Sequence, residues 1–386
     1  MALTNFANLT QEEKTMWSMD FWKQARNNSF IAQFAGKGQN SMVQRITELK
    51  KSEKGARAVI TLIADLEGDG IMGDFTLEGN EEAIKSHDQV IQIDQIRQAN
   101  RLAGRMADQA SIVNFRKASR DVLAYWAADR IDQLAFLTLS GVAYTSRTNG
   151  ATRNVEAADG ANLSELEYAA DVTAPSDDRW FRWDSHTTAG AWAAGNTALV
   201  EDGDTITYAS LVWAKAMAKD KFIRGIKTGG GEEVYHVFLT PTAMAQLRLD
   251  SDYITNVRHA APRSKNNELF AGTSSTMVDG MVIHEFRHVY NTYGIADGSK
   301  WGTTSTGSTD GCRALFCGAQ ALGMADIGNA YWEEDDFDYN NSPGISVGKM
   351  LGFLKPVFTT QYSQKAEKDQ DHGVMCLDYA TTPAAS

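Results

Sequence analysis

Residues 57–96 read RAVITLIADLEGDGIMGDFTLEGNEEAIKSHDQVIQIDQI, and their pattern decides how the rest of the chain is interpreted. The first ten residues are rich in strand-forming side chains, a Gly- and Asp-rich turn follows, and residues 88–96 alternate polar with apolar positions. Such alternation is typical of a half-buried strand. The pattern predicts a two-stranded arm, which is barely stable in water on its own. Unless the arm packs on its own body, we expect it to cover a neighbouring subunit, which favours assembly over catalysis.

A long helix is predicted directly after the arm, over residues 105–140, because this segment contains no Gly or Pro. Apolar residues from Ile112 to Trp126 recur on one face at helical spacing. A helix of this length measures roughly 50 Å. We expect it to end at Gly141, and we expect its last turns to be buried because they are apolar on every side.

Composition limits the class of protein further. With 386 residues the chain exceeds the size at which a single core stops growing, so two or more lobes are expected. The formal net charge of -12 opposes tight nonspecific binding to a nucleic-acid backbone. Residues 1–57 carry nine Lys or Arg against five Asp or Glu. This mildly basic start suits an arm that docks on an acidic neighbouring copy, and a solvated segment explains it equally well.

Cysteine usage and the first residues indicate a reducing compartment. The three cysteines, Cys312, Cys317 and Cys376, form no disulfide framework. The start MALTNFANLTQEEKTMW has no apolar region typical of a signal peptide. No run approaches the roughly 20 apolar residues that span a bilayer. We therefore expect the protein to be made and retained in a cytoplasm unless an assembly carries it out.

Helices and strands are mixed along the remainder without a regular β-α-β alternation, which predicts the α+β fold class. Residues 1–54 are interpreted as an arm with short helical pieces, and residues 145–204 as a long loop region or surface insertion. The remaining predicted elements are helices at 208–220 and 243–249 and strands at 235–239, 281–290, 313–317, 345–354 and 374–377. Two segments are expected to separate the later strands: the Gly-, Ser- and Thr-rich residues 302–311 and the acidic residues 333–338.

The stretch from His284 to His288 reads HEFRH and matches the H-E-x-x-H pattern of zinc proteases. That chemistry needs both imidazoles on one face of a helix, with the glutamate as base. The flanking residues have strand composition instead, and on a strand positions four apart lie about 13 Å from each other. We therefore favour a half-exposed strand. A zinc hydrolase that uses His284, Glu285 and His288 remains the alternative from the enzyme class.

Four other motifs favour structural roles over ligand binding. Residues 65–70 imitate the start of a calcium loop, but the twelfth position is Thr76 in place of the required Glu, so a turn is the preferred interpretation. The acidic residues 333–338 are interpreted as a solvated loop rather than a divalent-ion site, and the glycines of 228–231 as a turn. The aromatic residues of 180–183 suit packing or a subunit contact. No catalytic, cofactor-binding or metal-binding residue is predicted.

A further set of segments carries a family resemblance: Phe21-Trp22, RLAGRMADQASIVNFRKASRDVLAYWAADRIDQLAFLTLSG at 101–141, RWFRWD at 179–184, KDKFIRGIK at 219–227, EVYHVFLTPTAMAQLRLD at 233–250, VDGMVIHEFRHVYNTYG at 278–294, CRALFCGAQALGMADIG at 312–328 and FDYNNSPGISVGKMLGFLKPVF at 337–358. Together they resemble the major capsid proteins of tailed bacteriophages, in the branch similar to the N-four coat protein. They keep the family's order and span most of the chain, and residues 145–175 match it least.

The resemblance implies the Hong Kong 97-like capsid fold. That fold has an N-terminal arm, an extended E-loop, a P-domain containing a long spine helix, and an A-domain. Carried onto this chain, the arm corresponds to 1–54, the E-loop to 55–103, the P-domain with spine helix and insertion to 104–204, the A-domain to 205–330, and the return strands of the P-domain with a C-terminal strand to 331–386.

The resemblance also implies self-association into hexamers and pentamers. These close into an icosahedral shell around double-stranded DNA, which is enclosed without sequence-specific binding, and each E-loop lies across a neighbour's spine helix. The expected partners are other copies of the chain, a scaffolding protein, a portal and a decoration protein, with assembly in the host cytoplasm and neither a cofactor nor a membrane. An encapsulin-like nanocompartment shell remains a second alternative.

The predicted subunit contacts lie in the arm and the E-loop. Some members of this fold cross-link an E-loop lysine to an asparagine of another subunit, and Lys85 is the only lysine in 58–103. The contact candidates are Phe21, Trp22, Ile71, Met72, Asp74, Phe75 and Lys85.

Overall fold

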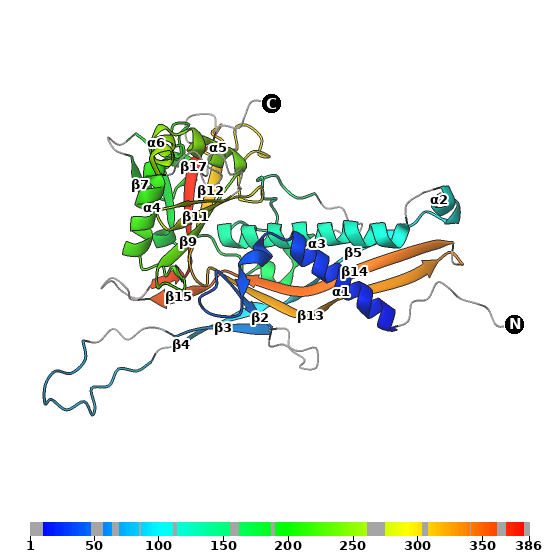
Figure 1. The fold of residues 1–386 in the computed structure, drawn as a ribbon, viewed down its shortest axis with the longest axis horizontal. Coiled ribbons are helices and arrows are strands. Elements are labelled where there is room, and N and C mark those ends of the chain that lie inside the picture. Colours follow the sequence, from blue (N-terminus) through cyan, green and yellow to red (C-terminus); the bar gives the residue numbers. More distant parts are fainter. Residues whose placement is uncertain are drawn as a thin grey trace.

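The computed structural model describes residues 11–47, 57–63, 69–84, 86–110, 114–154, 162–186, 190–260, 275–302, 308–339, 341–360 and 368–381. The molecule is elongated. A lobe of sheet and short helices lies at one end, and a long, narrow sheet crossed by two helices forms the other (Figure 1). The predicted α+β class is confirmed, because helices and mostly antiparallel strands form separate layers.

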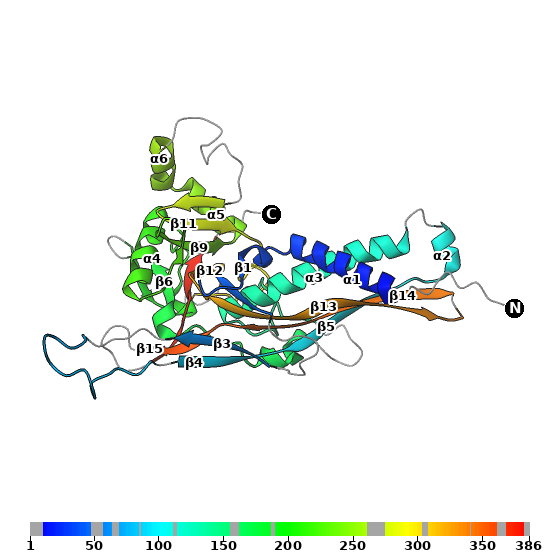
Figure 2. The same cartoon turned by 60° about the horizontal axis from the view of Figure 1, so that its bottom comes forward.

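The narrow sheet has the strand order β1-β2-β13-β14-β5. Its two longest strands, β13 and β14, pair antiparallel, and a register shift interrupts them between Ile327 and Tyr331. Helices α1 and α3 cover one face of the sheet, and the hairpin of β3 and β4 lies beneath it (Figure 2). The elements are α1 Gln11–Asn28, η1 Ile31–Phe34, β1 Ala35–Gly36, β2 Val43–Ile46, β3 Arg57–Ile63, β4 Ser86–Gln92, β5 Asp94–Arg101, α3 Phe115–Ser140, β13 Leu322–Phe337 and β14 Ser342–Leu354.

The predicted separator at 333–338 is wrong, because residues 333–337 belong to β13. Two of its charges are neutralised by distant cations. Glu333 forms an ion pair with Lys14 of α1 at 2.8 Å, and Glu334 pairs with Arg116 of α3 at 2.7 Å. These pairs allow an acidic run to continue as a strand beneath the helices.

The long helix is shorter than predicted. Residues 105–110 form a separate helix, α2 (Arg105–Ala110), and Asn114 has an extended backbone whose side chain caps α3 by accepting from the Lys117 amide. At the other end Gly141 takes a left-handed φ of 65° and terminates α3 as expected. With 26 residues, α3 measures about 39 Å. Its last turns are buried on every side, as predicted.

The second sheet contains β10-β11-β9-β12-β17-β6-β7 in that order, with β8 paired to β9. The predicted strands at 235–239, 313–317 and 374–377 are confirmed within β9, β12 and β17. The strand predicted at 281–290 ends early, since β11 stops at Glu285 and a turn follows. The bounds are β6 Trp180–Asp184, β7 Ala191–Ala194, β8 Ile226–Lys227, β9 Glu233–Leu239, β10 Ser275–Val278, β11 Met281–Glu285, β12 Gly311–Cys317 and β17 Val374–Ala380.

Residues 145–204 are predicted as a long loop region or a surface insertion, and the described part is largely loop but also contributes two strands and buried residues to the core. Strand β6 pairs with β17, and β7 completes the same sheet. Tyr168 is fully buried beside Tyr144 and Phe353. The segment is therefore part of the core, although its described helical pieces are only single turns. These are η2 Leu163–Glu165, η3 Glu167–Ala169, η4 Asp177–Arg179 and η5 Thr197–Leu199.

Three helices surround the second sheet, and the two predicted helices are among them. Helix α4 (Tyr208–Asp220) begins with a capping box between Thr207 and Ser210. Helix α5 (Pro241–Leu249) starts with proline and is capped by Thr240, and α6 (Ser251–Ala260) follows it. In the described part of the chain, no helix is long and apolar enough to cross a membrane.

The two sheets do not follow the predicted division at residue 331. Strand β13 begins at Leu322, inside the segment assigned to the A-domain, and β17 lies in the second sheet between β12 and β6. Within the described part of 331–386, β14 and the end of β13 belong to the narrow sheet and β17 to the second sheet. A small antiparallel pair, β15 (Val357–Thr360) and β16 (Lys368–Asp371), connects them.

Candidate assembly surfaces

The base of the β3–β4 hairpin packs on the body of its own chain. Ala58, Ile60 and Ile91 face inward and form a small core with Ala325 of β13 and Leu354 of β14. The backbones approach so closely that a Cβ atom at Gly352 would lie 2.1 Å from the Gln92 carbonyl oxygen. The alternation recognised in the sequence therefore reflects burial against the narrow sheet.

A side chain fixes the register of this base. The Gln89 amide oxygen accepts a hydrogen bond from the Val357 amide at 2.9 Å, and its amide nitrogen donates to the Val357 carbonyl. The Gln89 side chain of β4 thus binds the backbone of β15 through both of its amide atoms, much as a neighbouring strand does. The direction in which the hairpin leaves the body is set by contacts within one chain.

Beyond this base, residues 69–84, here called the hairpin tip, extend away from both sheets (Figures 1 and 2). They form neither helix nor strand. The tip contains five acidic residues and no Lys or Arg. Its large apolar side chains face solvent, with Met72 73% and Phe75 80% exposed, and Leu77 and Ile84 are exposed as well. Clustered apolar side chains on such a projection are typical of a surface that another molecule covers.

The structure brings four of the predicted contact residues together and separates the others. Ile71, Met72, Asp74 and Phe75 all lie in the hairpin tip, where Ile71 is half-buried and the other three are exposed. Lys85 lies outside the described residues. Phe21 and Trp22 are only 1% and 7% exposed. Both side chains pack within their own chain, and their contact with a neighbour stays a prediction.

Helix α1 docks on the narrow sheet and on α3 of its own chain. Trp17 stacks on Trp332 with ring centroids 5.7 Å apart, and the Ser18 hydroxyl donates to the Ala330 carbonyl. The Lys349 ammonium lies 4.5 Å from the centre of the Trp22 ring. Aromatic, polar and cation–π contacts thus hold the arm along its length.

The chain leaves α1 through an elbow held by Asp132 of α3. The Asp132 carboxylate accepts hydrogen bonds from the Ser29 hydroxyl at 2.7 Å, the Phe30 amide at 2.9 Å and the Ile31 amide at 3.0 Å. Burial raises the pKa of Asp132, and the three donors oppose that rise. This buried carboxylate joins the segment that follows α1 to α3.

The three functional positions of the HEFRH stretch have different partners. His284 lies in β11, with its Nε2 3.0 Å from Nδ1 of His236, while Glu285 faces Arg248 at 3.8 Å. His288 lies beyond the strand, with its Nε2 2.8 Å from Asp129 of α3. The Asp129 pKa is lowered, chiefly by that contact. The side chains do not converge, so the geometry gives no support to a zinc hydrolase.

His284 belongs to an aromatic cluster that receives the arm. Phe34 of η1 packs edge-on against His236 and His284, with centroid distances of 5.0 Å to each. Phe30 stacks on Phe286 at 4.2 Å. Burial lowers the pKa of His284 to about 4, and the neighbouring His236 adds to this effect. The motif therefore serves packing between the arm and the second sheet.

The aromatic and cysteine motifs also have structural roles. Trp183 is buried and packs against Trp192, and the Trp180 indole nitrogen donates to Asp378 at 2.6 Å. All three cysteines are buried. The imitation calcium loop at 65–70 lies largely outside the described residues.

One group of side chains in the described chain could approach a cation. Asp184, His186 and Asp204 place ligand atoms within 4.8 Å of one another. Asp204 already accepts hydrogen bonds from the Ser185 amide at 2.8 Å and the Glu201 amide at 2.9 Å. These bonds give the group a structural role in the turn before α4.

Comparisons with known proteins find similarity to phage capsid proteins. The model of the phage capsid protein family matches residues 5–382. The chain is 59% identical over 366 residues to the major capsid protein of Pseudomonas phage KPP25, covering 95% of both chains. Its fold is similar to the capsid of Ralstonia phage GP4 (TM-score 0.71, 25% identity, 92% of both chains). It is also similar to the Cyanophage Pam1 capsid (TM-score 0.69, 17% identity, 100% of this chain and 97% of that chain).

Proposed function

This chain belongs to the phage capsid protein family, and we propose that its copies form hexamers and pentamers that close into the icosahedral head of a tailed bacteriophage around double-stranded DNA. Its fold is Hong Kong 97-like, and its role in the virion is structural rather than enzymatic. Neither alternative, the zinc hydrolase or the nanocompartment shell, is supported by the family and its relatives.

The observation that carries this proposal is the hairpin tip. A folded chain that holds Phe75 and Met72 in water gains little from them by itself. Covering them on a neighbour gives a contact in which two different surfaces meet. Repetition of such a head-to-tail contact gives a ring when the rotation between neighbours closes, which the capsomers proposed here require. Each subunit both gives and receives a tip, so modest contacts add up once a neighbour is bound.

The parts of the subunit can be assigned on this basis. The narrow sheet with α3 corresponds to the P-domain and its spine helix, and the second sheet with α4, α5 and α6 corresponds to the A-domain. The hairpin of β3 and β4 corresponds to the E-loop. Helix α1 and the segment to β2 correspond to the N-terminal arm, which ties the two sheets of one subunit together.

Other components follow from the same role. We expect a separate scaffolding protein to guide assembly in the host cytoplasm, a portal to occupy one vertex, and a decoration protein to bind the finished shell. The net charge of -12 disfavours tight contact with packaged DNA. Enclosure without sequence-specific binding is the mode that this charge supports.

Electron microscopy of particles from cells that express the chain with its scaffolding protein tests the proposal. The expected result is closed shells whose reconstruction shows hexamers and pentamers of this subunit. A protein that stays monomeric at every concentration and with its scaffolding protein present would contradict it.

A further inference from the structure

Four arginines lie close together where the C-terminal half of helix α3 meets two later turns of the chain. One turn covers residues 144–153, and the other follows strand β11. A hydrogen bond from the Asn291 amide to the Thr148 carbonyl joins the two turns at 2.9 Å. The four residues, here called the arginine cluster, are Arg130 of α3, Arg147 and Arg153 of the first turn, and Arg287 of the second.

Neutral oxygen atoms hold two of these arginines together. The guanidinium groups of Arg130 and Arg153 donate to one shared atom, the side-chain oxygen of Gln133, at 2.8 and 3.1 Å. Arg153 also donates to the carbonyl oxygens of Tyr144 and Ser146, at 2.9 and 3.2 Å. These contacts fix the positions of two cations without supplying a negative charge.

Among the residues that the structure describes, Asp129 is the one carboxylate in ion-pair contact with the cluster. It lies 2.8 Å from Arg287 and 3.9 Å from Arg130. Four guanidinium groups therefore face one carboxylate, although the whole chain has a net charge of -12. Burial and the charges of Arg130 and Arg147 lower the pKa of Arg153 to about 10, so Arg153 stays protonated at neutral pH. The cluster carries an excess of positive charge.

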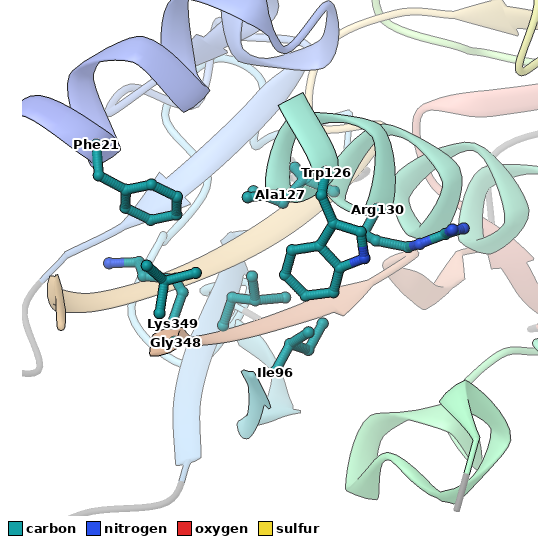
Figure 3. Close-up of a pocket in the computed structure, with 10 residues that line it drawn as sticks. Phe21, Ile96, Trp126, Ala127, Arg130, Gly348 and Lys349 are labelled. Atoms are coloured by element: carbon teal, nitrogen blue, oxygen red, sulfur yellow. The ribbon is translucent and has the colours of Figure 1, made fainter. Parts of the chain in front are cut away.

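A bound anion relieves this excess, and the cluster is open to one. Guanidinium groups held close together repel one another, and each can bind a phosphate through two parallel hydrogen bonds. The Arg287 side chain is 73% exposed, and Arg147 is exposed as well. Arg130 extends away from Phe21 and Lys349, which line a small apolar hollow beside it (Figure 3).

The residues beside the cluster favour a nucleic-acid backbone over a protein as the source of that anion. Within 145–152 the exposed residues other than Arg147 are Thr145, Asn149 and Thr152, which are all short and polar. Protein interfaces have a core of large apolar side chains, whereas phosphate contacts use Arg together with Ser, Thr and Asn. Resting on the shell function proposed above, we propose that the arginine cluster contacts the phosphate backbone of the enclosed double-stranded DNA.

This contact gives the subunit an orientation in the shell. It places the turn at 144–153 and the neighbouring part of α3 on the inner surface. Phosphate contacts carry no information about the base sequence, so they agree with enclosure without sequence-specific binding. The acidic remainder of the chain repels DNA, which keeps the attraction local to the cluster.

Photo-cross-linking in DNA-filled heads tests the contact. Asn149→Cys places an exposed thiol two positions from Arg147, and the three native cysteines are buried and leave the background low. A photoreactive azide attached to that thiol is expected to cross-link the packaged DNA on illumination. The matched control is Lys227→Cys, an exposed position of β8 at the opposite end of β9 from the turn that carries Arg287, about 20 Å along the strand.

The cross-linked product identifies what lies against the cluster. DNA joined to residue 149, with little joined to residue 227, supports the contact. Equal cross-linking at the two positions, none at either, or a product that joins residue 149 only to protein overturns the contact and leaves shell formation standing. If the unmodified chain forms no closed heads, it is the proposed function that fails.

DNA binding by purified subunits gives a second measurement in case the cysteine variants do not assemble. The fluorescence anisotropy of a short labelled DNA duplex is followed over a range of salt concentrations. Arg147→Gln together with Arg287→Gln is expected to weaken binding about tenfold at low salt and to reduce the salt slope by about two, because two phosphate contacts are lost.

Two control pairs separate charge at the cluster from net charge and from damage to the fold. Lys219→Gln with Lys227→Gln removes the same charge from exposed positions of the second lobe and is expected to change the affinity by about twofold or less. Arg147→Lys with Arg287→Lys keeps the charge at the cluster and is expected to keep most of the salt slope. If the first pair of variants has the same slope as the unmodified chain, the cluster does not bind phosphate.

Discussion

Helix α1 lies on the body of its own chain and buries Phe21 and Trp22 there, although Met16 and Met19 stay exposed, whereas the hairpin tip projects from the body. Phe21 of α1 is 1% exposed, whereas Phe75 of the tip is 80% exposed. Sequence patterns place both segments in arms that reach a neighbour. The structure separates them, since α1 packs on its own subunit and the tip leaves most of its large side chains exposed.

The difference follows from what each segment finds on its own body. Helix α1 finds Glu333 for Lys14, the Trp332 ring for Trp17 and the Ala330 carbonyl for Ser18. The tip leaves through a hairpin base whose direction Gln89 and the close approach at Gly352 fix, and this carries it away from both sheets. Both segments carry large apolar side chains. The position of each segment relative to its own body decides whether those side chains are buried in the subunit or left exposed.

The largest effect on subunit stability is expected from Phe21→Ala. Removing a fully buried ring costs about 3–5 kcal/mol of unfolding free energy. Urea denaturation of unassembled subunits measures it. If this variant is as stable as the unmodified chain, the docking of α1 does not stabilise the subunit, and the contrast drawn between the two segments is wrong.

Asp132→Ala is expected to cost about 2–3 kcal/mol. It leaves the Ser29 hydroxyl and two backbone amides without their acceptor, and the relief of a buried charge offsets only part of this loss. The same urea titration, together with protease cleavage near residues 29–46, reports it. Lys117→Ala is the control on the same helix, with an expected change below about 0.5 kcal/mol, since Lys117 is exposed.

Acid is expected to loosen the arm from the second sheet. The folded pKa of His284 is lowered from 6.5 to about 4, so its contribution is complete above pH 6.5 and is lost as the pH falls toward 4. Allowing for partial exposure, the loss amounts to about 2 kcal/mol. The pH dependence of unfolding measures it, and His284→Phe is expected to flatten the curve between these values. A curve that keeps its slope in that variant would assign the acid sensitivity to another group.

The smallest effect on stability is expected from Phe75→Ala. An exposed side chain with no role in its own core changes the unfolding free energy by less than about 0.5 kcal/mol. The same variant is expected to reduce shell formation, as sedimentation velocity measures. A large loss of stability without loss of assembly would reverse the roles of the two segments.

Much of the fold could be predicted because local periodicity and burial agree. The hairpin strands, α4, β9, β12 and β14 all have patterns that their own neighbours in the sequence support. Strand β13 could not be predicted, because its acidic half is stabilised by Lys14 and Arg116, which lie more than 200 positions earlier in the chain. The strands and buried residues of segment 145–204 could not be predicted for the same reason, since the burial of Tyr168 and Trp183 depends on strands far away in the sequence.

The predicted subunit-contact residues also show that local sequence does not reveal which surface a side chain covers. The sequence identifies Ile71, Met72, Asp74 and Phe75 as apolar or charged residues around a turn, and the structure places them together on the tip. It also identifies Phe21 and Trp22 as large apolar residues in an arm, but it cannot show which surface they cover.

Removal of the hairpin tip tests the central claim most directly. A chain in which a short glycine linker replaces residues 69–84 can be compared with the unmodified chain by sedimentation velocity and electron microscopy, under the same assembly conditions for both. We predict a folded subunit with an unchanged urea midpoint that forms no stable shells. Shells of normal size and yield from the shortened chain would contradict the claim that this projection holds neighbouring subunits together.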